Sequence, residues 1–231
     1  IMLNTAVAEE LREFADELEA ADDFAAALDT LVRREISAHR RILFNGNGYS
    51  AEWPQEAARR GLLNLASTPE ALPHYVDQKN LDLFARHGVY SESEMRSRLE
   101  IVLEEYAKTI RIEGCTSADM LRKMILPACM AYSKKVADGA AVKKGLGICA
   151  DAEIKLASEV TARTAALMEM TDALEQALAG IPEPAEKAAP YCRDHVIPAM
   201  EAARADADAL ERMVDRSAWP MPDYTDLLFY V

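Results

Sequence analysis

The sequence predicts an all-α protein, a bundle of long helices that ends in an antiparallel C-terminal helical hairpin. Two observations lead to this prediction. Apolar residues recur three and four positions apart over most of the 231 residues, which is the spacing of one helix face. No β-rich section, with strands of alternating apolar and polar residues, interrupts this pattern. The layer that results is helix packed on helix, so the fold class is all-α.

The first part of the chain predicts two helices. Residues 3–21 form the first, which Asn4 or Thr5 can cap. Its inner stripe consists of Val7, Leu11, Phe14 and Leu18. Asp22 or Asp23 starts a second helix, whose expected inner face consists of Phe24, Leu28, Leu31, Val32 and Ile36. Cations follow at the end of this helix, where they complement its dipole: Arg33, Arg34, His39, Arg40 and Arg41. We interpret that basic run as structural.

The segment Asn45-Gly46-Asn47-Gly48 predicts a tight irregular turn, because all four residues tolerate positive φ. Ser50 is expected to cap the helix that follows. The pattern Gly46-x-Gly48-x-x-Ala51 also matches the loose dinucleotide-binding fingerprint. No βαβ unit surrounds the match, and Glu70, where a ribose-binding acid should end a strand, lies in a helix start. A structural turn whose Asn side chains bond their own backbone is the favoured interpretation.

The middle of the chain carries clear helix boundaries. Gly88 is expected to end a helix in the left-handed conformation. Ser91 and Glu94 form a capping box for the next helix, with Tyr90 and Met95 as its hydrophobic staple. Another helix is expected to start at residues 116–119. Pro127 lies in its interior and predicts a bend rather than a break, with Met124 and Tyr132 facing inward on either side.

The last third predicts the helical hairpin. The first apolar seam consists of Ala157, Val160, Thr164, Leu167, Thr171, Leu174 and Leu178. The second consists of Val196, Met200, Ala203, Ala207, Leu210 and Val214. Because a short loop with two prolines, 180–184, joins them, the two helices should pack antiparallel at a shallow angle. In the tail, residues 219–224 are expected to be extended by their prolines, and residues 227–229 are expected to bury an anchor against the helical body.

Composition excludes several classes of protein. The net charge of −13 repels phosphate backbones, so we expect no nucleic-acid partner. No apolar run reaches the 18 or so residues of a membrane span, and no signal-peptide pattern opens the chain. We therefore expect a cytoplasmic protein without a membrane partner. The first residue, Ile1, suggests a fragment, a processed chain or a trimmed chain.

Neither the cysteines nor the histidines have the spacing of a metal site. Zinc sites need thiolates paired closely in sequence, and helical di-iron sites need Glu-x-x-His. The cysteines are instead expected to be buried free thiols: Cys115, Cys129, Cys149 and Cys192. The histidines are expected at helix ends or on the surface: His39, His74, His87 and His195. We therefore assign no catalytic, cofactor-binding or metal-ligating residue.

Five segments, in order along almost the whole chain, resemble the C-terminal part of type III glutamine synthetases. They are LNTAVAE from Leu3, HRRILFNGNGYSAEW from His39, RRGLLNL from Arg59, YCRDHVIPAM from Tyr191 and WPMPDYTDLLF from Trp219. The glycine turn and the Trp-Pro tail are the most specific of these, and residues 143–152 are the least diagnostic.

The resemblance implies a cytoplasmic, oligomeric ligase that joins ammonia to glutamate through γ-glutamyl phosphate, with ATP and Mg²⁺ or Mn²⁺. It implies that residues 1–44 are the helical end of the catalytic domain and 45–231 the C-terminal helical domain. The family's site motifs have no counterpart in this sequence, so the segment itself is expected to be inactive, without a cofactor of its own. Its expected partners are its own catalytic domain and neighbouring subunits of a homo-oligomer, and its expected role is packing, assembly or regulation.

Two alternatives remain open. The chain could be a free-standing helical interaction or oligomerisation module that shares only the architecture. It could also be a helical-bundle enzyme with an unrecognised carboxylate site, which is disfavoured because the Asp and Glu residues lie mostly on solvated helix faces without Glu-x-x-His pairs.

Overall fold

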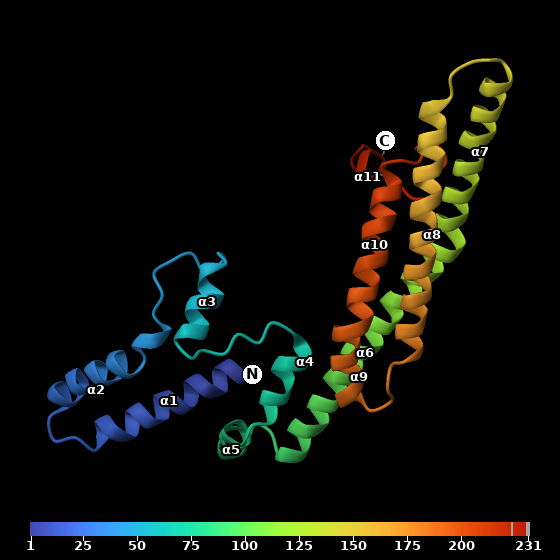
Figure 1. Ribbon diagram of the computed structural model, residues 1–231. Coiled ribbons are helices and arrows are strands. Elements are labelled where there is room, and N and C mark those ends of the chain that lie inside the picture. Colours follow the sequence, from blue (N-terminus) through green and yellow to red (C-terminus); the bar gives the residue numbers. More distant parts are fainter. Residues whose placement is uncertain (223, 230–231) are drawn as a thin grey trace. The chain divides into compact units, whose positions relative to one another are not determined.

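The computed structural model describes residues 1–222 and 224–229 of the chain (Figure 1). Every regular element in those ranges is a helix, so the prediction of an all-α fold is confirmed. The chain divides into two compact units, residues 1–101 and 102–231, and the boundary falls inside one long helix. None of the helices in the described ranges combines the length and the apolar character needed to cross a bilayer.

Short and medium helices make up the first unit. In chain order they are α1 (Met2–Glu19), α2 (Phe24–Ala38), the 3₁₀ turn η1 (Arg40–Ile42), α3 (Glu52–Arg59), α4 (Thr68–Ala71), the 3₁₀ turn η2 (Leu72–Val76) and α5 (Gln78–Arg86). Long helices follow: α6 (Glu92–Met120), the π-turn η3 (Leu121–Ile125), α7 (Leu126–Gly145), α8 (Asp151–Ala179), α9 (Ala185–Tyr191), the π-turn η4 (Cys192–Val196), α10 (Ile197–Glu211) and the short α11 (Tyr224–Leu228).

The two N-terminal helices begin differently from one another. Asp23 caps α2, because its carboxylate accepts a hydrogen bond from the Ala26 backbone N–H at 3.1 Å. The caps predicted for the first helix are wrong: α1 starts at Met2, before Asn4 and Thr5. Because Thr5 lies inside the helix, its hydroxyl donates a hydrogen bond to the Ile1 carbonyl, one turn earlier.

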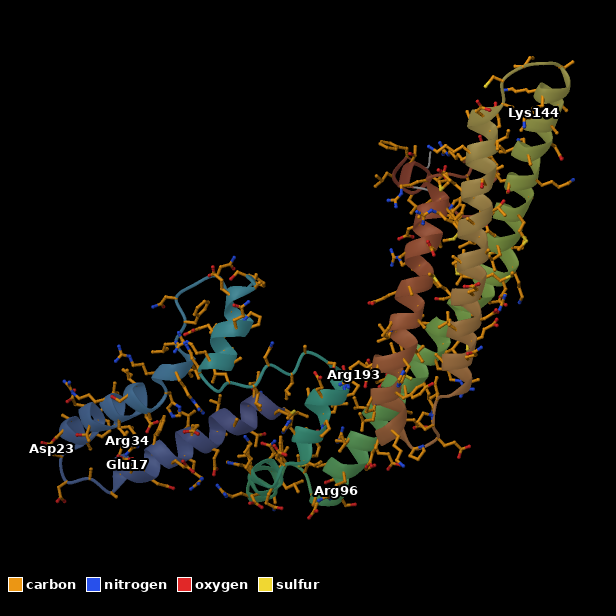
Figure 2. All side chains as sticks on the ribbon, viewed as in Figure 1. Glu17, Asp23, Arg34, Arg96, Lys144 and Arg193 are labelled. Carbon is orange, nitrogen blue, oxygen red and sulfur yellow. The ribbon has the colours of Figure 1, made fainter. Side chains whose placement is uncertain are left out.

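Ion pairs account for the first part of the basic run. The Arg34 guanidinium binds both carboxylate oxygens of Glu17, at 3.0 and 2.8 Å, and so joins α2 to α1 (Figure 2). Arg33 pairs with Asp29 one turn earlier on α2, at 2.7 Å. Both pairs are solvent-exposed, so they orient the helices more than they stabilise them.

The apolar stripes predicted to face inward on α1 and α2 are largely exposed, so this prediction is wrong for most of their residues. Leu11 on α1 is 61% exposed and Ile36 on α2 is 59% exposed, and of the five predicted positions on α2 only Leu31 is buried. The other exposed members are Val7, Phe24, Leu28 and Val32. Periodicity identifies an apolar helix face but not what covers it, and in the described part of this unit the face remains open.

The capping box and staple at the start of α6 are confirmed. The Ser91 backbone N–H donates to the Glu94 carboxylate at 2.8 Å, and the Glu94 N–H donates to the Ser91 hydroxyl at 3.3 Å. Met95 is fully buried in a small core with Leu81 and Phe84, and Tyr90 packs against that core. Gly88 has a φ of 60°, as the predicted left-handed helix end requires.

The helix predicted to start at residues 116–119 does not start there. α6 continues unbroken to Met120, and the Thr116 hydroxyl donates to the Ile112 carbonyl at 2.8 Å instead of capping a new helix. The chain then passes through η3 into α7 without a loop (Figure 1). Tertiary packing of this long helix therefore outweighs the local preference of a Thr-Ser-Ala-Asp sequence for a helix start.

Each of the two π-turns ends two residues before a proline, Pro127 in α7 and Pro198 in α10. At η3 the Leu126 N–H donates to the Leu121 carbonyl, five residues back, because a proline cannot continue the normal i→i−4 pattern. The helix is therefore continued rather than broken, as predicted. The π-turn shifts the helical phase, however, so Met124 is exposed rather than inward, whereas Tyr132 packs against the core.

The long helices of the second unit pack through the predicted apolar seams. Six of the seven predicted positions on α8 are buried, and α8 packs against both α7 and α10. Val160 of α8 lies in one core cluster with Leu210 of α10, whereas Leu174 clusters with Val196 of η4. That order of contacts favours the predicted antiparallel hairpin. The buried hydroxyls of α8, on Thr164 and Thr171, donate to carbonyls one turn earlier.

The tail only partly follows its prediction. Trp219 and Met221 pack against the core of the second unit. The anchor predicted at residues 227–229 is wrong, because all three side chains are exposed and Phe229 is 72% exposed. Residues 224–228 form the short helix α11, which begins at the last residue of the segment predicted to be extended, and Asp223 of that segment lies outside the described residues.

Candidate functional site

The glycine turn is built around the ring of Phe44. This ring packs on Trp53, with ring centroids 4.4 Å apart, and the Arg60 guanidinium lies 5.8 Å from its centroid. A Cβ atom at Gly46 would collide with the ring, which accounts for a glycine at that position without any ligand. The Arg60 side chain also donates to the Leu43 carbonyl at 2.7 Å, so it ties α3 back to the start of the turn.

The backbone of the turn differs from the prediction in two ways. Neither Gly46 nor Gly48 has positive φ. Ser50 does not cap α3: its hydroxyl donates to the Asn47 carbonyl at 2.9 Å, and α3 has no side-chain cap. The Asn47 side chain does bond its own backbone, as expected, because it accepts a hydrogen bond from the Tyr49 N–H at 3.0 Å.

The context of a dinucleotide-binding loop does not occur here. Elements η1 and α3, both helical, flank the turn, whereas the fingerprint requires a strand before it. Glu70 lies in the four-residue helix α4, not at the end of a strand. The turn is thus explained by the packing of Phe44 rather than by phosphate binding.

The cysteines and histidines do not gather at one place. Cys129 and Cys192 are buried, and burial raises the pKa of both thiols. Cys115 and Cys149 are exposed, so the prediction that all four are buried is wrong for these two. Residues 1–222 and 224–229 contain no group of three or more His, Cys, Asp or Glu side chains placed to hold a metal ion.

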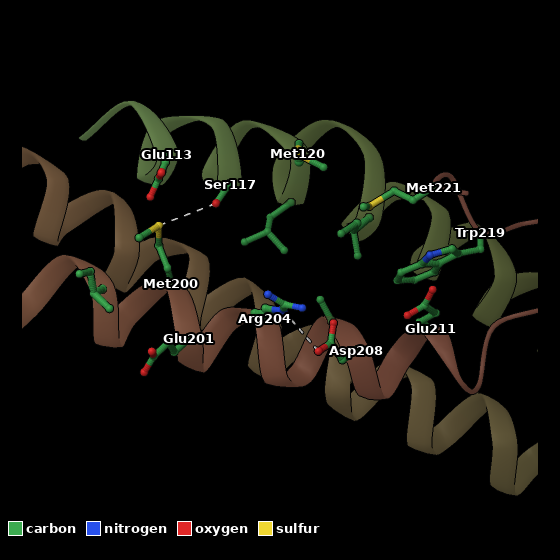
Figure 3. Close-up of a pocket in the computed structure, with 14 residues that line it drawn as sticks. Glu113, Ser117, Met120, Met200, Glu201, Arg204, Asp208, Glu211, Trp219 and Met221 are labelled. Atoms are coloured by element: carbon green, nitrogen blue, oxygen red, sulfur yellow. Dashed lines mark hydrogen bonds and ion pairs between the residues drawn. The ribbon is translucent and has the colours of Figure 1, made fainter. Parts of the chain in front are cut away.

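The second unit contains a groove between its helices. It runs between α6 and η3 on one side and α10 on the other, with a volume of about 530 Å³ (Figure 3). Buried apolar side chains form its floor, among them Leu121 and Ile125 from η3 and Ala207 from α10. Leu121 and Ile125 are four residues apart and both buried, so they lie on the same side of the long helix.

Side-chain contacts narrow the groove near both ends. Near one end, the Ser117 hydroxyl lies 3.8 Å from the Met200 sulfur and links α6 to α10, while Glu113 and Ile197 line the groove beyond this contact. At the other end Trp219 and Met221 from the tail fold over the opening, as Figure 3 shows. The groove is therefore a trough that narrows near both ends and opens to solvent along its length.

Carboxylates dominate the rim. Glu113 lies on α6, and Glu201, Asp208 and Glu211 lie on α10, while Arg204 is the cation among the described lining residues. Arg204 pairs with Asp208 at 3.5 Å. Four carboxylates against one guanidinium leave an excess of three negative charges. Within the described ranges, the three glutamates form no ion pair.

The groove has the chemistry of a binding surface. Its described lining residues include no histidine or cysteine, and the hydroxyl of Ser117 lies against a thioether rather than against a base that could activate it. Sequence reasoning missed this groove. The spacing of Glu201, Asp208 and Glu211, seven and then three residues apart, was the available signal, because it places them on one face of α10.

Comparison with known proteins identifies the family of this chain. The family model of the glutamine synthetase C-terminal domain matches residues 27–144. The chain is 34% identical to a glutamine synthetase of Butyrivibrio fibrisolvens over 91% of its length. It is 34% identical to the type-3 glutamine synthetase of Dictyostelium discoideum and 31% identical to a glutamine synthetase of Bacteroides fragilis (strain YCH46), over 99% of its length in both cases.

The alignments cover almost all of this chain but a much smaller share of each relative. The aligned part amounts to 31% of the Butyrivibrio protein and 33% of each of the other two, so the chain spans about a third of the relatives' length. The family model covers about half of the chain, and the resemblance to type III enzymes found from the sequence is confirmed. This chain therefore belongs to the glutamine synthetase C-terminal domain family.

Proposed function

We propose that the chain is the C-terminal helical part of a glutamine synthetase and serves its packing, assembly or regulation rather than its catalysis. The whole enzyme would join ammonia to glutamate at the expense of ATP, with γ-glutamyl phosphate as the intermediate. Residues 1–44 would be the helical end of the catalytic domain and residues 45–231 the C-terminal helical domain. The relatives' names and the length of relative left outside the match support this proposal.

One structural observation carries the proposal furthest: the exposed apolar stripe on α2. Phe24, Leu28, Val32 and Ile36 follow one another at intervals of four residues, and all are exposed in the chain as described. An apolar helix face of this length is costly in water, at about 25 cal/mol per Å² of apolar surface. The stripe therefore suits burial against the remaining two thirds of the enzyme, including its catalytic domain.

ATP and the divalent metal of the family do not fit the described residues of this segment. Magnesium and manganese sites use several carboxylate or imidazole ligands, and no such group occurs in residues 1–222 or 224–229. The glycine turn lacks the strand that precedes a dinucleotide-binding loop. We therefore assign the nucleotide and the metal to the rest of the enzyme and derive no step of the reaction from this chain.

The first test reads the coding sequence on either side of this chain. A reading frame that continues into the rest of a glutamine synthetase supports the proposal. A frame that begins immediately before Ile1, with its own start codon, supports the free-standing interaction module instead.

The second test uses the full-length enzyme and a double variant of α2, Leu28→Glu with Val32→Glu. We expect reduced assembly by sedimentation velocity and reduced γ-glutamyl transfer to hydroxylamine. The control replaces two exposed apolar residues on α7 and in the turn after it, Val142→Glu with Leu146→Glu, which are more exposed than Leu28 and Val32. In the chain of 231 residues alone, we expect at most a small change in melting temperature for either variant, because all four side chains are exposed. Equal effects of the two variants on the full enzyme would contradict the role of α2.

A further inference from the structure

The helices around the groove between α6 and α10 are arranged like a helical bundle in which one helix position is empty. α8 packs against α7 on one side and against α10 on the other. On the groove side, α6 with η3 and α10 leave a trough between them, which buried apolar residues line: Leu121, Ile125 and Ala207. In helical bundles a further helix commonly fills such a trough. This surface lies in the second unit and does not depend on the function proposed above.

The dimensions of the trough suit a short helix. The α10 wall extends from Ile197 to Glu211, beside Trp219. Fourteen helical steps at about 1.5 Å each give a length of about 21 Å, or roughly four turns. Trp219 and Met221 present an aromatic ring and a thioether at the far end, which are side chains typical of helix-binding grooves.

The charge of the rim selects the occupant. Glu113 borders one side of the trough and Glu201, Asp208 and Glu211 border the other, with Arg204 as the counter-charge. A helix with an apolar stripe would place that stripe on the floor and its flanking residues beside these carboxylates. We propose that the groove binds a basic amphipathic helix of about four turns from another polypeptide, with Lys or Arg on both sides of its apolar stripe.

A second copy of this chain fits the groove less well than a basic helix does, because its charge does not complement the acidic rim. The chain carries a net charge of −13, and both copies would bring that charge to an acidic rim. Its own exposed tail helix, with Leu227 and Leu228, carries Asp226 as well. Charge complementarity therefore favours a basic partner.

The test uses the full chain with Trp53→Phe, which leaves Trp219 at the end of the groove as the only indole. The probe is a designed peptide of about 14 residues, with leucine at helical three and four spacing and lysine at the other positions. The matched probe has glutamate in place of lysine. We expect the lysine peptide to change the Trp219 emission saturably and to bind at least tenfold tighter than the glutamate peptide. Raising the salt concentration should weaken its binding.

Charge reversal on the chain locates the binding. In Glu201→Lys with Asp208→Lys, both on the rim, we expect the lysine peptide to bind at least tenfold more weakly. The control, Glu105→Lys with Glu169→Lys, changes the net charge equally at exposed positions that do not line the groove. Circular dichroism melting checks that both variants remain folded.

Three outcomes would overturn the proposal. The lysine peptide could fail to bind, the glutamate peptide could bind as tightly, or the two pairs of reversals could weaken binding equally. Sedimentation equilibrium covers another occupant: a dimer of the peptide-free chain that the rim reversal abolishes would mean that a second copy fills the groove, again overturning the proposal.

Discussion

The imidazole Nε2 of His87 lies 2.7 Å from a carboxylate oxygen of Glu9, so the end of α5 is joined to the middle of α1. Among the described residues Glu9 is the one charged residue that is buried, and it also pairs with Arg12 and Arg86. Residues 77 or 78 positions apart in sequence thus meet at one carboxylate. This cluster joins α1 to α5 through charged groups, whereas α1 was predicted to pack through an apolar stripe.

Replacing Glu9 by Gln should therefore destabilise the first unit. The amide keeps the shape of the carboxylate but loses its charge-assisted hydrogen bonds, at a cost of about 1–3 kcal/mol. Urea unfolding followed by the emission of Trp53, in a Trp219→Phe background, reports on this unit. Glu10→Gln, at the exposed neighbouring position, is the control and should unfold like the parent. An equal effect of both substitutions would contradict the role of the cluster.

The capping box gives stability at α6 a defined pH dependence. The Ser91 backbone N–H, followed by its hydroxyl, holds the pKa of Glu94 below its ordinary value of 4.5. Since the folded pKa is the lower one, the stabilisation is present above about pH 4.5 and is lost as the pH falls through the folded pKa. Glu94→Gln should unfold more easily than the parent at pH 7, and the difference should vanish in acid. With Glu100→Gln, an exposed position on α6, we expect no such pH-dependent difference.

Substitutions at two helical glycines should change the stability of the second unit in opposite directions. A Cβ at Gly139 in α7 would meet no atom within 4 Å, so Gly139→Ala should stabilise the second unit by about 0.5–1 kcal/mol. At Gly114 in α6 the Cβ would lie 2.8 Å from a Leu178 methyl carbon and 3.2 Å from one of Val196. Gly114→Val should therefore destabilise the unit by about 1–3 kcal/mol. Thermal melting by circular dichroism measures both, and a stabilising Gly114→Val would refute this view of the α6 contact.

The tail offers two aromatic residues in contrasting environments. Trp219 packs against the core, whereas Phe229 is exposed. We expect Trp219→Ala to cost about 2–3 kcal/mol, less than the loss of a fully buried aromatic, and Phe229→Ala to leave stability unchanged. Chemical denaturation monitored by circular dichroism distinguishes them. Equal effects would mean that the end of the tail contributes as much as Trp219 does.

The accuracy of the sequence predictions depends on how local their physical causes are. The Ser91 and Glu94 box was predictable because both partners lie within one turn. The seam of α8 was predictable because its apolar positions repeat at helical spacing and neighbouring helices of the same unit cover them. By contrast, the exposed face of α2 has the same periodicity, and only its partner decides whether it is buried.

The groove was not predictable for a related reason. Its floor includes Leu121 and Ile125 of the π-turn before Pro127, and the proline alone does not specify that turn. Its end depends on Trp219, which packs against the core from beyond α10. The contact of Trp219 is long-range, and the acidic spacing on α10 looks like an ordinary solvated face.

The unequal exposure of the cysteines allows a distance to be measured in the chain without any substitution. Thiol-reactive spin labels should attach to Cys115 on α6 and Cys149 beyond α7, whereas burial and a raised pKa shield Cys129 and Cys192. The two accessible thiols lie on opposite sides of the π-turn η3 along the chain. Dipolar spectroscopy on the labelled wild-type protein would therefore measure the distribution of distances between the two labels. A narrow distribution would mean that the helix is rigid at η3, and a broad one that it bends there.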